Sequence, residues 1–126
     1  MNSLKGANPI VVICTRDVDR AVLFYRDVLG LTFDRQDRFG AVFTLAATEL
    51  RIALVADFVP HGHTMLGFQV KDVAAAVRTL SAGGAAFLRI AAYSHDELGV
   101  VTLPHGAGHV AWMKDPDGNI LSITDV

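Results

Sequence analysis

The side chains able to bind a metal ion or to transfer protons lie at a few separated places in this sequence. His61 and His63 stand two residues apart in a connection, Glu49 opens an apolar run, and His109 follows the glycine-rich stretch 105–108. Imidazole and carboxylate groups are the usual protein donors for first-row transition metals when several converge on one point. We therefore keep these four side chains as candidate ligands of a recruited metal, with a solvent-exposed position as the simpler interpretation of each.

Nucleophilic catalysis has weaker support. Cys14 is the single cysteine, and it shares a predicted strand face with the apolar side chains of Ile10 and Val12. A thiol in apolar surroundings without a basic neighbour is usually inert. Ser122 is a candidate hydroxyl for a Ser–His–Asp arrangement, but no histidine is predicted beside it. The glycines at 106 and 108 lack the spacing of a phosphate-binding loop and indicate a turn.

A seven-residue pattern occurs twice and organises the elements that must position these side chains. Residues 16–22 and 71–77 both read basic-Asp-Val-x-x-Ala-Val, and their aspartates, Asp17 and Asp72, are 55 residues apart. Each copy follows a short apolar run and opens a segment with helical spacing. Aspartate is a favoured helix N-cap. The repeat therefore predicts a duplicated module in which a strand leads into an Asp-capped helix.

Apolar periodicity gives both halves the order strand-helix-strand-strand-strand. Glycines end each helix, and the Asp-Pro-Asp-Gly sequence at 115–118 predicts the turn of the last hairpin. Residues 91–108 have no clear period, apart from a candidate short strand at 100–103. The predicted strands are 10–15, 31–36, 41–46, 49–55, 65–70, 86–90, 110–114 and 120–124, and the predicted helices are 18–29 and 73–82.

Composition narrows the classes of function. Hydrophobic residues make up 52% of the chain and the formal net charge is −2, with no run of like charge longer than two residues. This balance argues against a nucleic-acid partner or an anionic membrane surface. No apolar stretch is long enough to span a bilayer, and residues 1–9 lack the apolar core of a signal peptide. The single cysteine excludes an internal disulfide, so we expect a cytoplasmic protein.

Two motifs carry a resemblance to a known family. The helix end at 24–31, FYRDVLGL, and the turn at 114–119, KDPDGN, stand in the right order and spacing after the Asp-Val motif at 16–21. Together they resemble the vicinal oxygen chelate superfamily of glyoxalase I, bleomycin- and fosfomycin-resistance proteins and extradiol dioxygenases. The resemblance implies an α+β fold, with two βαβββ modules at 9–56 and 64–126 whose curved mixed sheets enclose a cavity, and commonly a homodimer.

The resemblance also implies where a metal would be held. Metal-using members place His or Glu on the inward faces of four strands, and the matching positions here are Ile10, Ala53, Met65 and Ser122. None of these side chains is an imidazole or a carboxylate, which sites of this type need. We therefore predict no metal and no cofactor, and a cavity that is drier and more apolar.

The leading hypothesis is metal-independent binding, or sequestration, of a small apolar or aromatic molecule, similar to the bleomycin-resistance branch. Stacking on Trp112 and an amide contact from Gln69 would orient the ligand, although Trp112 is equally well interpreted as core filler. The predicted ligand-binding residues share cavity-facing strand positions: Ile10, Val12, Cys14, Ala53, Met65, Gly67, Gln69, Trp112 and Ser122.

Two alternatives remain open. The first is a metal-dependent lyase, isomerase or oxygenase related to glyoxalase, with displaced ligands among His61, His63, Glu49 and His109. The second is an interaction module whose cavity is filled by its own side chains. Tyr93 and His95 lie in the long loop and are interpreted as exposed surface residues, with a lid as the functional alternative.

Overall fold

The structure, a computed structural model, describes residues 3–126 and divides into two compact units. The first unit ends at Phe58 and the second comprises Val59–Val126. The predicted modules 9–56 and 64–126 lie within these units. Among the described residues, no helix is long and apolar enough to cross a membrane.

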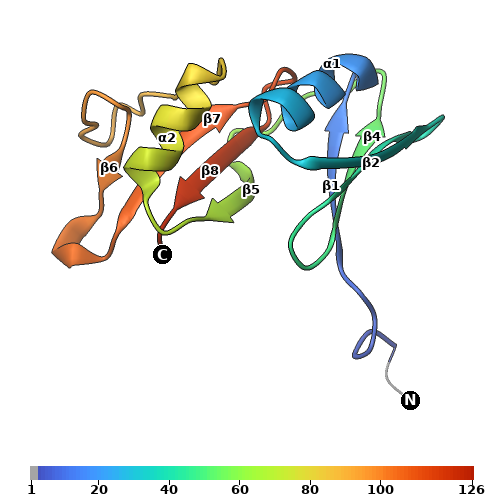
Figure 1. Cartoon of the computed structure of the whole chain (residues 1–126), viewed down its shortest axis with the longest axis horizontal. Coiled ribbons are helices and arrows are strands. Elements are labelled where there is room, and N and C mark those ends of the chain that lie inside the picture. The colour runs from blue at the N-terminus through green and yellow to red at the C-terminus, as the bar shows by residue number, and fades with distance from the viewer. Residues whose placement is uncertain (1–2) are drawn as a thin grey trace. The chain divides into compact units, whose positions relative to one another are not determined.

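The first unit is a four-stranded sheet with one helical segment. Its strands are β1 (Ile10–Thr15), β2 (Thr32–Asp37), β3 (Gly40–Thr44) and β4 (Glu49–Leu54), and its helical turns are α1 (Val18–Leu23) and η1 (Phe24–Val28) (Figure 1). The strand order is β1-β4-β3-β2. β1 and β4 pair in parallel, and the other neighbours pair antiparallel.

The second unit repeats this plan. Its elements are β5 (Thr64–Gln69), α2 (Val73–Ala82), β6 (Val101–Thr102), the 3-10 turn η2 (Pro104–Gly106), β7 (His109–Lys114) and β8 (Ile120–Thr124). The strand order β5-β8-β7-β6 has the same parallel first pair, and α2 packs against β7 and β8 (Figure 1). Two mixed sheets with segregated helices confirm the predicted α+β class.

Local sequence signals placed the helix starts and the last turn correctly. The side chain of Asp17 accepts a hydrogen bond from the Arg20 N–H at 3.1 Å, and that of Asp72 accepts from the Ala75 N–H at 3.0 Å. In the hairpin turn, the Gly118 N–H donates to the Asp115 carbonyl at 3.0 Å, and Gly118 has a φ of 91°. Both Asp caps and the turn were predicted because they depend only on neighbours in the chain.

Two predicted elements were wrong in part. Residues 86–90 do not form a full strand: Phe87 makes an isolated bridge to Met113, and the Leu88 N–H donates to the Trp112 carbonyl at 2.7 Å. The chain then leaves the sheet, and β6 pairs with β7 instead. The predicted helix 18–29 changes to a π-helical turn at η1, where the Leu29 N–H reaches the Phe24 carbonyl at 3.0 Å. The spacing of apolar residues does not reveal a helical turn that is wider by one residue.

In each unit the core lies between the sheet and its helix. In the first unit Ile13, Tyr25, Phe43, Leu50 and Ile52 are almost fully buried, and in the second Val77, Ala111, Met113, Leu121 and Ile123 are. Side chains alternate between the two faces of a strand, so the residues between these core positions lie on the face that carries no helix. We call this the helix-free face of each sheet.

Gly40, the first residue of β3, provides a test of this packing. Its φ is +145°, and a Cβ there would lie 1.8 Å from the Ile52 carbonyl oxygen. We expect Gly40→Ala to lower the free energy of unfolding by at least about 2 kcal/mol, because backbone atoms must move and φ is strained. Gly62→Ala, whose Cβ would meet no atom within 4 Å, is the control. Urea unfolding of both variants measures the difference. Equal stabilities would contradict the close approach of Gly40 to the Ile52 backbone.

Candidate functional site

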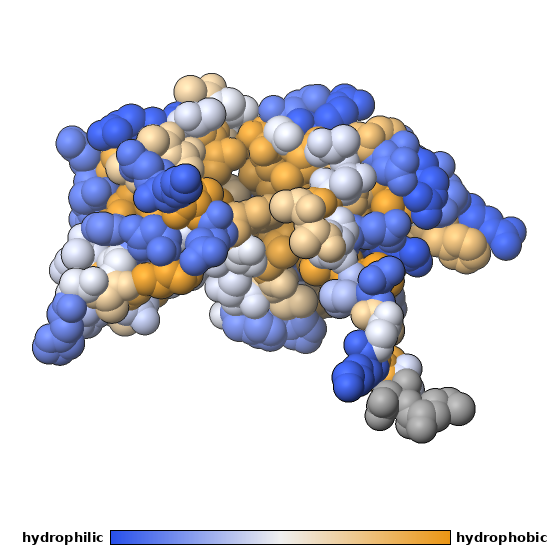
Figure 2. Space-filling model, turned by 60° about the horizontal axis from the view of Figure 1, so that its bottom comes forward, coloured by the Kyte–Doolittle hydropathy of each residue, from blue (hydrophilic) through white to orange (hydrophobic). Residues whose placement is uncertain are grey.

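The helix-free face of the first unit contains a groove of about 310 Å³. Its apolar wall includes Ile10, Val12 and Phe39, whose residues are 45%, 49% and 69% exposed. Figure 2 shows hydrophobic residues, in orange, at the surface of the molecule among hydrophilic residues, in blue. The groove is lined by Ile10, Val12, Arg35, Asp37, Phe39, Ala41, Val42, Arg51, Ile52 and Ala53.

The groove brings together three of the predicted ligand-binding residues, Ile10, Val12 and Ala53. Cys14 pairs with Ala53 in the β1–β4 register, so it lies on the same face, although it does not line the groove. Its exposure is intermediate. The face is therefore as apolar along β1 as the sequence indicated.

Two guanidinium groups and the Asp37 carboxylate supply the polar part of the groove. Arg35 donates to Asp34 at 2.6 Å, and Arg51 donates to Glu49 at 3.1 Å. Glu49 is therefore held in a partly exposed ion pair with Arg51. Arginine has five N–H donors, so these ion pairs leave donors available for a bound molecule.

The helix-free face of the second unit holds four more predicted residues. Trp112, Ser122 and Gly67 are register neighbours across β7, β8 and β5, and Gln69 is the exposed last residue of β5. A Cβ at Gly67 would lie 2.8 Å from the Ser122 hydroxyl oxygen, so the glycine makes room for this buried hydroxyl. The fifth predicted residue, Met65, has no register partner, because it lies at the irregularity between Thr64 and Leu66.

Two residues of the long loop at 91–108 pack against Trp112. The sequence analysis did not predict this contact. The Tyr93 ring lies 5.4 Å from the Trp112 ring at 30°, and the His95 ring lies 6.4 Å from it at 67°. His95 is also bonded within its loop: Nε2 accepts from the Ile90 N–H at 2.9 Å, and Nδ1 lies 2.8 Å from the Gly99 carbonyl oxygen. Tyr93 remains 49% exposed, as the sequence indicated, whereas His95 is half-buried and its interpretation as an exposed surface residue was wrong.

The donor set does not fit a metal of the glyoxalase type. The four positions that the resemblance implied present Ile10, Ala53, Met65 and Ser122 on β1, β4, β5 and β8. His61 and His63 are exposed, with ring centroids 5.6 Å apart. Over residues 3–126, no three or more His, Cys, Asp or Glu side chains are grouped so as to hold a metal ion.

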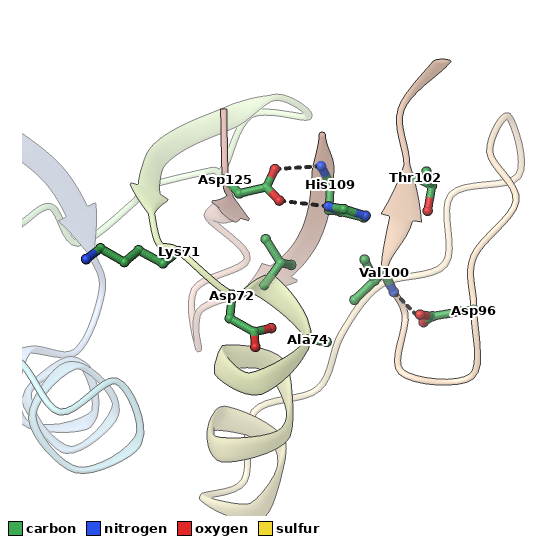
Figure 3. A pocket seen from close by; sticks show the side chains of 9 residues that line it. Lys71, Asp72, Ala74, Asp96, Val100, Thr102, His109 and Asp125 are labelled. Atoms are coloured by element: carbon green, nitrogen blue, oxygen red, sulfur yellow. Dashed lines mark hydrogen bonds and ion pairs between the residues drawn. The ribbon is translucent and has the colours of Figure 1, made fainter. Parts of the chain in front are cut away.

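A second pocket, of about 420 Å³, lies on the helix side of the second sheet, where α2 begins (Figure 3). We call it the dyad pocket, because it contains a hydrogen-bonded His–Asp pair. Nδ1 of His109 is 2.7 Å from Oδ2 of Asp125, and the His109 backbone N–H donates to Oδ1 of the same carboxylate at 2.7 Å. The pocket is lined by Lys71, Asp72, Val73, Ala74, Asp96, Val100, Thr102, His109 and Asp125.

The electrostatics of the dyad follow from these hydrogen bonds. The His109 ring and backbone N–H groups lower the pKa of Asp125 below its ordinary value of 3.8, because both stabilise the charged carboxylate. Gly108 permits this geometry, since a Cβ there would lie 2.5 Å from Asp125 Oδ1. Sequence reasoning named His109 but missed Asp125, which lies one residue beyond β8. The alternation of β8 was the available signal, because it places residue 125 on the same face as 121 and 123.

The family model of the Glyoxalase/Bleomycin resistance protein/Dioxygenase superfamily matches residues 8–123. No curated protein sequence matches the chain.

Solved structures share the fold over nearly the whole chain. UcmS2 is 18% identical with a TM-score of 0.75, covering 98% of this chain and 100% of UcmS2. A superfamily member from Sphaerobacter thermophilus is 20% identical with a TM-score of 0.74, covering 97% and 98% of the two chains. A lactoylglutathione lyase from Agrobacterium tumefaciens is 21% identical with a TM-score of 0.68, covering 94% and 92%. At such identities the likeness establishes the fold.

The contact between Tyr93 and Trp112 is tested by tryptophan emission, because Trp112 is the single tryptophan. We expect Tyr93→Ala to shift the emission to the red and to cost about 1 kcal/mol of stability, since the indole loses an aromatic neighbour at 5.4 Å. Tyr93→Phe keeps the ring and should keep the wild-type emission. An unshifted spectrum in the alanine variant would show that Tyr93 does not cover the indole.

The lowered pKa of Asp125 predicts a pH-dependent contribution to stability. The contribution is present above the unfolded-state pKa, which is about 4, and it is lost as the pH falls through the lower folded-state pKa. We expect Asp125→Asn to be less stable than wild type near pH 7, and the difference to shrink below about pH 4. Urea unfolding across this range measures it. A difference that grows as the pH falls would have the wrong sign for a stabilised carboxylate.

Proposed function

Because this chain belongs to the glyoxalase/bleomycin resistance protein/dioxygenase superfamily, we propose that it binds a small, largely apolar or aromatic molecule without a metal ion. The observation that carries the proposal is the groove on the helix-free face of the first unit. Its volume of about 310 Å³ is within the range of small-molecule sites, which are mostly apolar with a few placed polar groups. Exposed Ile10 and Val12 supply the apolar part. Arg35, Asp37 and Arg51 supply the polar part.

Burial of apolar surface would drive the association. Ile10 and Val12 are each about half exposed, and covering them would contribute roughly 1 kcal/mol apiece. Phe39 adds a largely exposed ring at the rim, with the Arg38 guanidinium carbon 4.9 Å from its centroid. An aromatic ligand gains most from such a wall, because a flat ring covers aliphatic side chains at little cost in conformational entropy.

The second unit offers a different surface for the same kind of ligand. Trp112 supports stacking, Gln69 supplies an exposed amide, and Ser122 supplies a hydroxyl beside Gly67. We propose these residues, together with Cys14 and Met65, as the remaining ligand-binding positions. The homodimer and the cytoplasmic location stay predictions.

Metal-dependent catalysis by a lyase, isomerase or oxygenase is the alternative, and a lactoylglutathione lyase shares the fold. It would require displaced ligands, and the two neighbouring imidazoles of His61 and His63 are the observation that keeps it open. Elemental analysis of the purified protein separates the two functions. Stoichiometric zinc, nickel, iron or manganese would overturn the metal-independent proposal.

A thermal-shift screen with aromatic antibiotics and aromatic metabolites in the presence of EDTA tests binding directly. A ligand that binds only the native state raises the melting temperature, and EDTA should leave the shift unchanged. We expect Val12→Gln to weaken binding by roughly 1 kcal/mol, about fivefold, because a polar amide replaces a groove wall.

Leu23→Gln is the matched control, because Leu23 is 54% exposed but lies on α1, outside the groove. Its affinity should equal that of wild type. Equal weakening in both variants, or the absence of any shift across the panel, would count against the groove as the binding site.

A further inference from the structure

The dyad pocket shares no lining residue with the groove, and its lining carries different chemical groups. It lies on the helix side of the second sheet, whereas Trp112 and Ser122 lie on the helix-free face. His109 and Thr102 face each other across β7 and β6, and Asp125 follows β8 beside them. Nothing in the proposed binding function uses this pocket or its imidazole.

The His109 ring is held in one orientation. Asp125 accepts from both the backbone N–H and the ring of His109, at 2.7 Å each, so the carboxylate fixes the position of the ring and places its proton on Nδ1. Nε2 is then the proton acceptor. Figure 3 shows this end of the ring turned away from Asp125 and toward Val100 and Thr102. No hydrogen bond from the described residues reaches Nε2.

The beginning of α2 supplies a complementary group. Val73 and Ala74 line the pocket at the first turn of this ten-residue helix, where backbone N–H groups have no intrahelical acceptor. Asp72 satisfies the Ala75 N–H, which lies one position further along the helix. The remaining N–H groups carry the positive end of the helix dipole, which favours a developing oxyanion. The oriented His109 imidazole and the first turn of α2 thus line one pocket, together with the carboxylates of Asp72 and Asp96.

We propose that the dyad pocket is a general-base site for hydrolysis of small activated esters. Nε2 of His109 takes a proton from water while the water oxygen bonds to the carbonyl carbon and the carbonyl electron pair moves to its oxygen. The tetrahedral intermediate collapses, the bond to the alcohol oxygen breaks, and the alcohol leaves with the proton from Nε2. One ester and one water give one acid and one alcohol. Asp72 and Asp96 make neutral or cationic esters the preferred substrates.

The probe is p-nitrophenyl acetate, a neutral ester whose product is coloured. We expect His109→Gln to lower the second-order rate constant at least about tenfold, because the base is lost. Asp125→Asn should lower it similarly, because an amide can donate to Nδ1 and leave the proton on Nε2. His105→Asn removes an exposed imidazole that does not line the pocket, introduces a residue that tolerates the φ of 58° at this position, and should retain the wild-type rate.

Two measurements on the wild-type protein keep the test independent of variant folding. General-base catalysis should be slower in D2O than in H2O, since a proton moves in the transition state. The rate should also exceed that of an equal concentration of free imidazole. A rate equal to free imidazole, or an equal loss in the His105 and His109 variants, would overturn the proposal. An identical rate in both solvents would assign attack by the imidazole itself and overturn the general-base role.

Discussion

Within residues 3–126, one helical segment covers one face of each four-stranded sheet, and the other face carries no helix. The rest of the structure depends on this difference between the two faces. α1 and η1 cover one face of the first sheet, and α2 covers one face of the second. The alternation of side chains then assigns every strand residue to the helix side or to the helix-free side. The helix side buries Ile13 and Leu121 completely, whereas the helix-free side leaves Val12 half exposed.

The same difference explains why two chemically different sites occur. A short helix covers only the middle of a sheet, so polar side chains at the strand ends remain accessible even on the helix side. His109 begins β7 and Asp125 follows β8, and both therefore meet at the start of α2 without entering the core. The helix-free face of the first unit has no such helix end, and its groove is formed mainly by aliphatic strand residues with arginines beside them.

Features that depend on residues close in the sequence, such as helix caps and turns, were predicted. Contacts between side chains far apart in the sequence were not. The Asp17 and Asp72 caps and the turn at 115–118 are local, and all three were predicted correctly. The contact of Tyr93 with Trp112 was not predicted, because it joins a loop without periodicity to a strand. Asp125 was missed for the same reason: its partner His109 is 16 residues away, and only the register of β7 and β8 joins them.

Glycine makes room for a polar side chain at two places in the second unit, and neither place is evident from the sequence. Gly67 leaves room for the Ser122 hydroxyl, and Gly108 leaves room for the Asp125 carboxylate; a Cβ at either position would lie within 2.8 Å of the respective oxygen. Gly108 also has a φ of +135°, so replacement would strain the backbone as well as displace Asp125. Both polar groups are therefore positioned by the absence of a side chain on a neighbouring segment. Their chemistry depends on backbone approach as much as on the donors themselves.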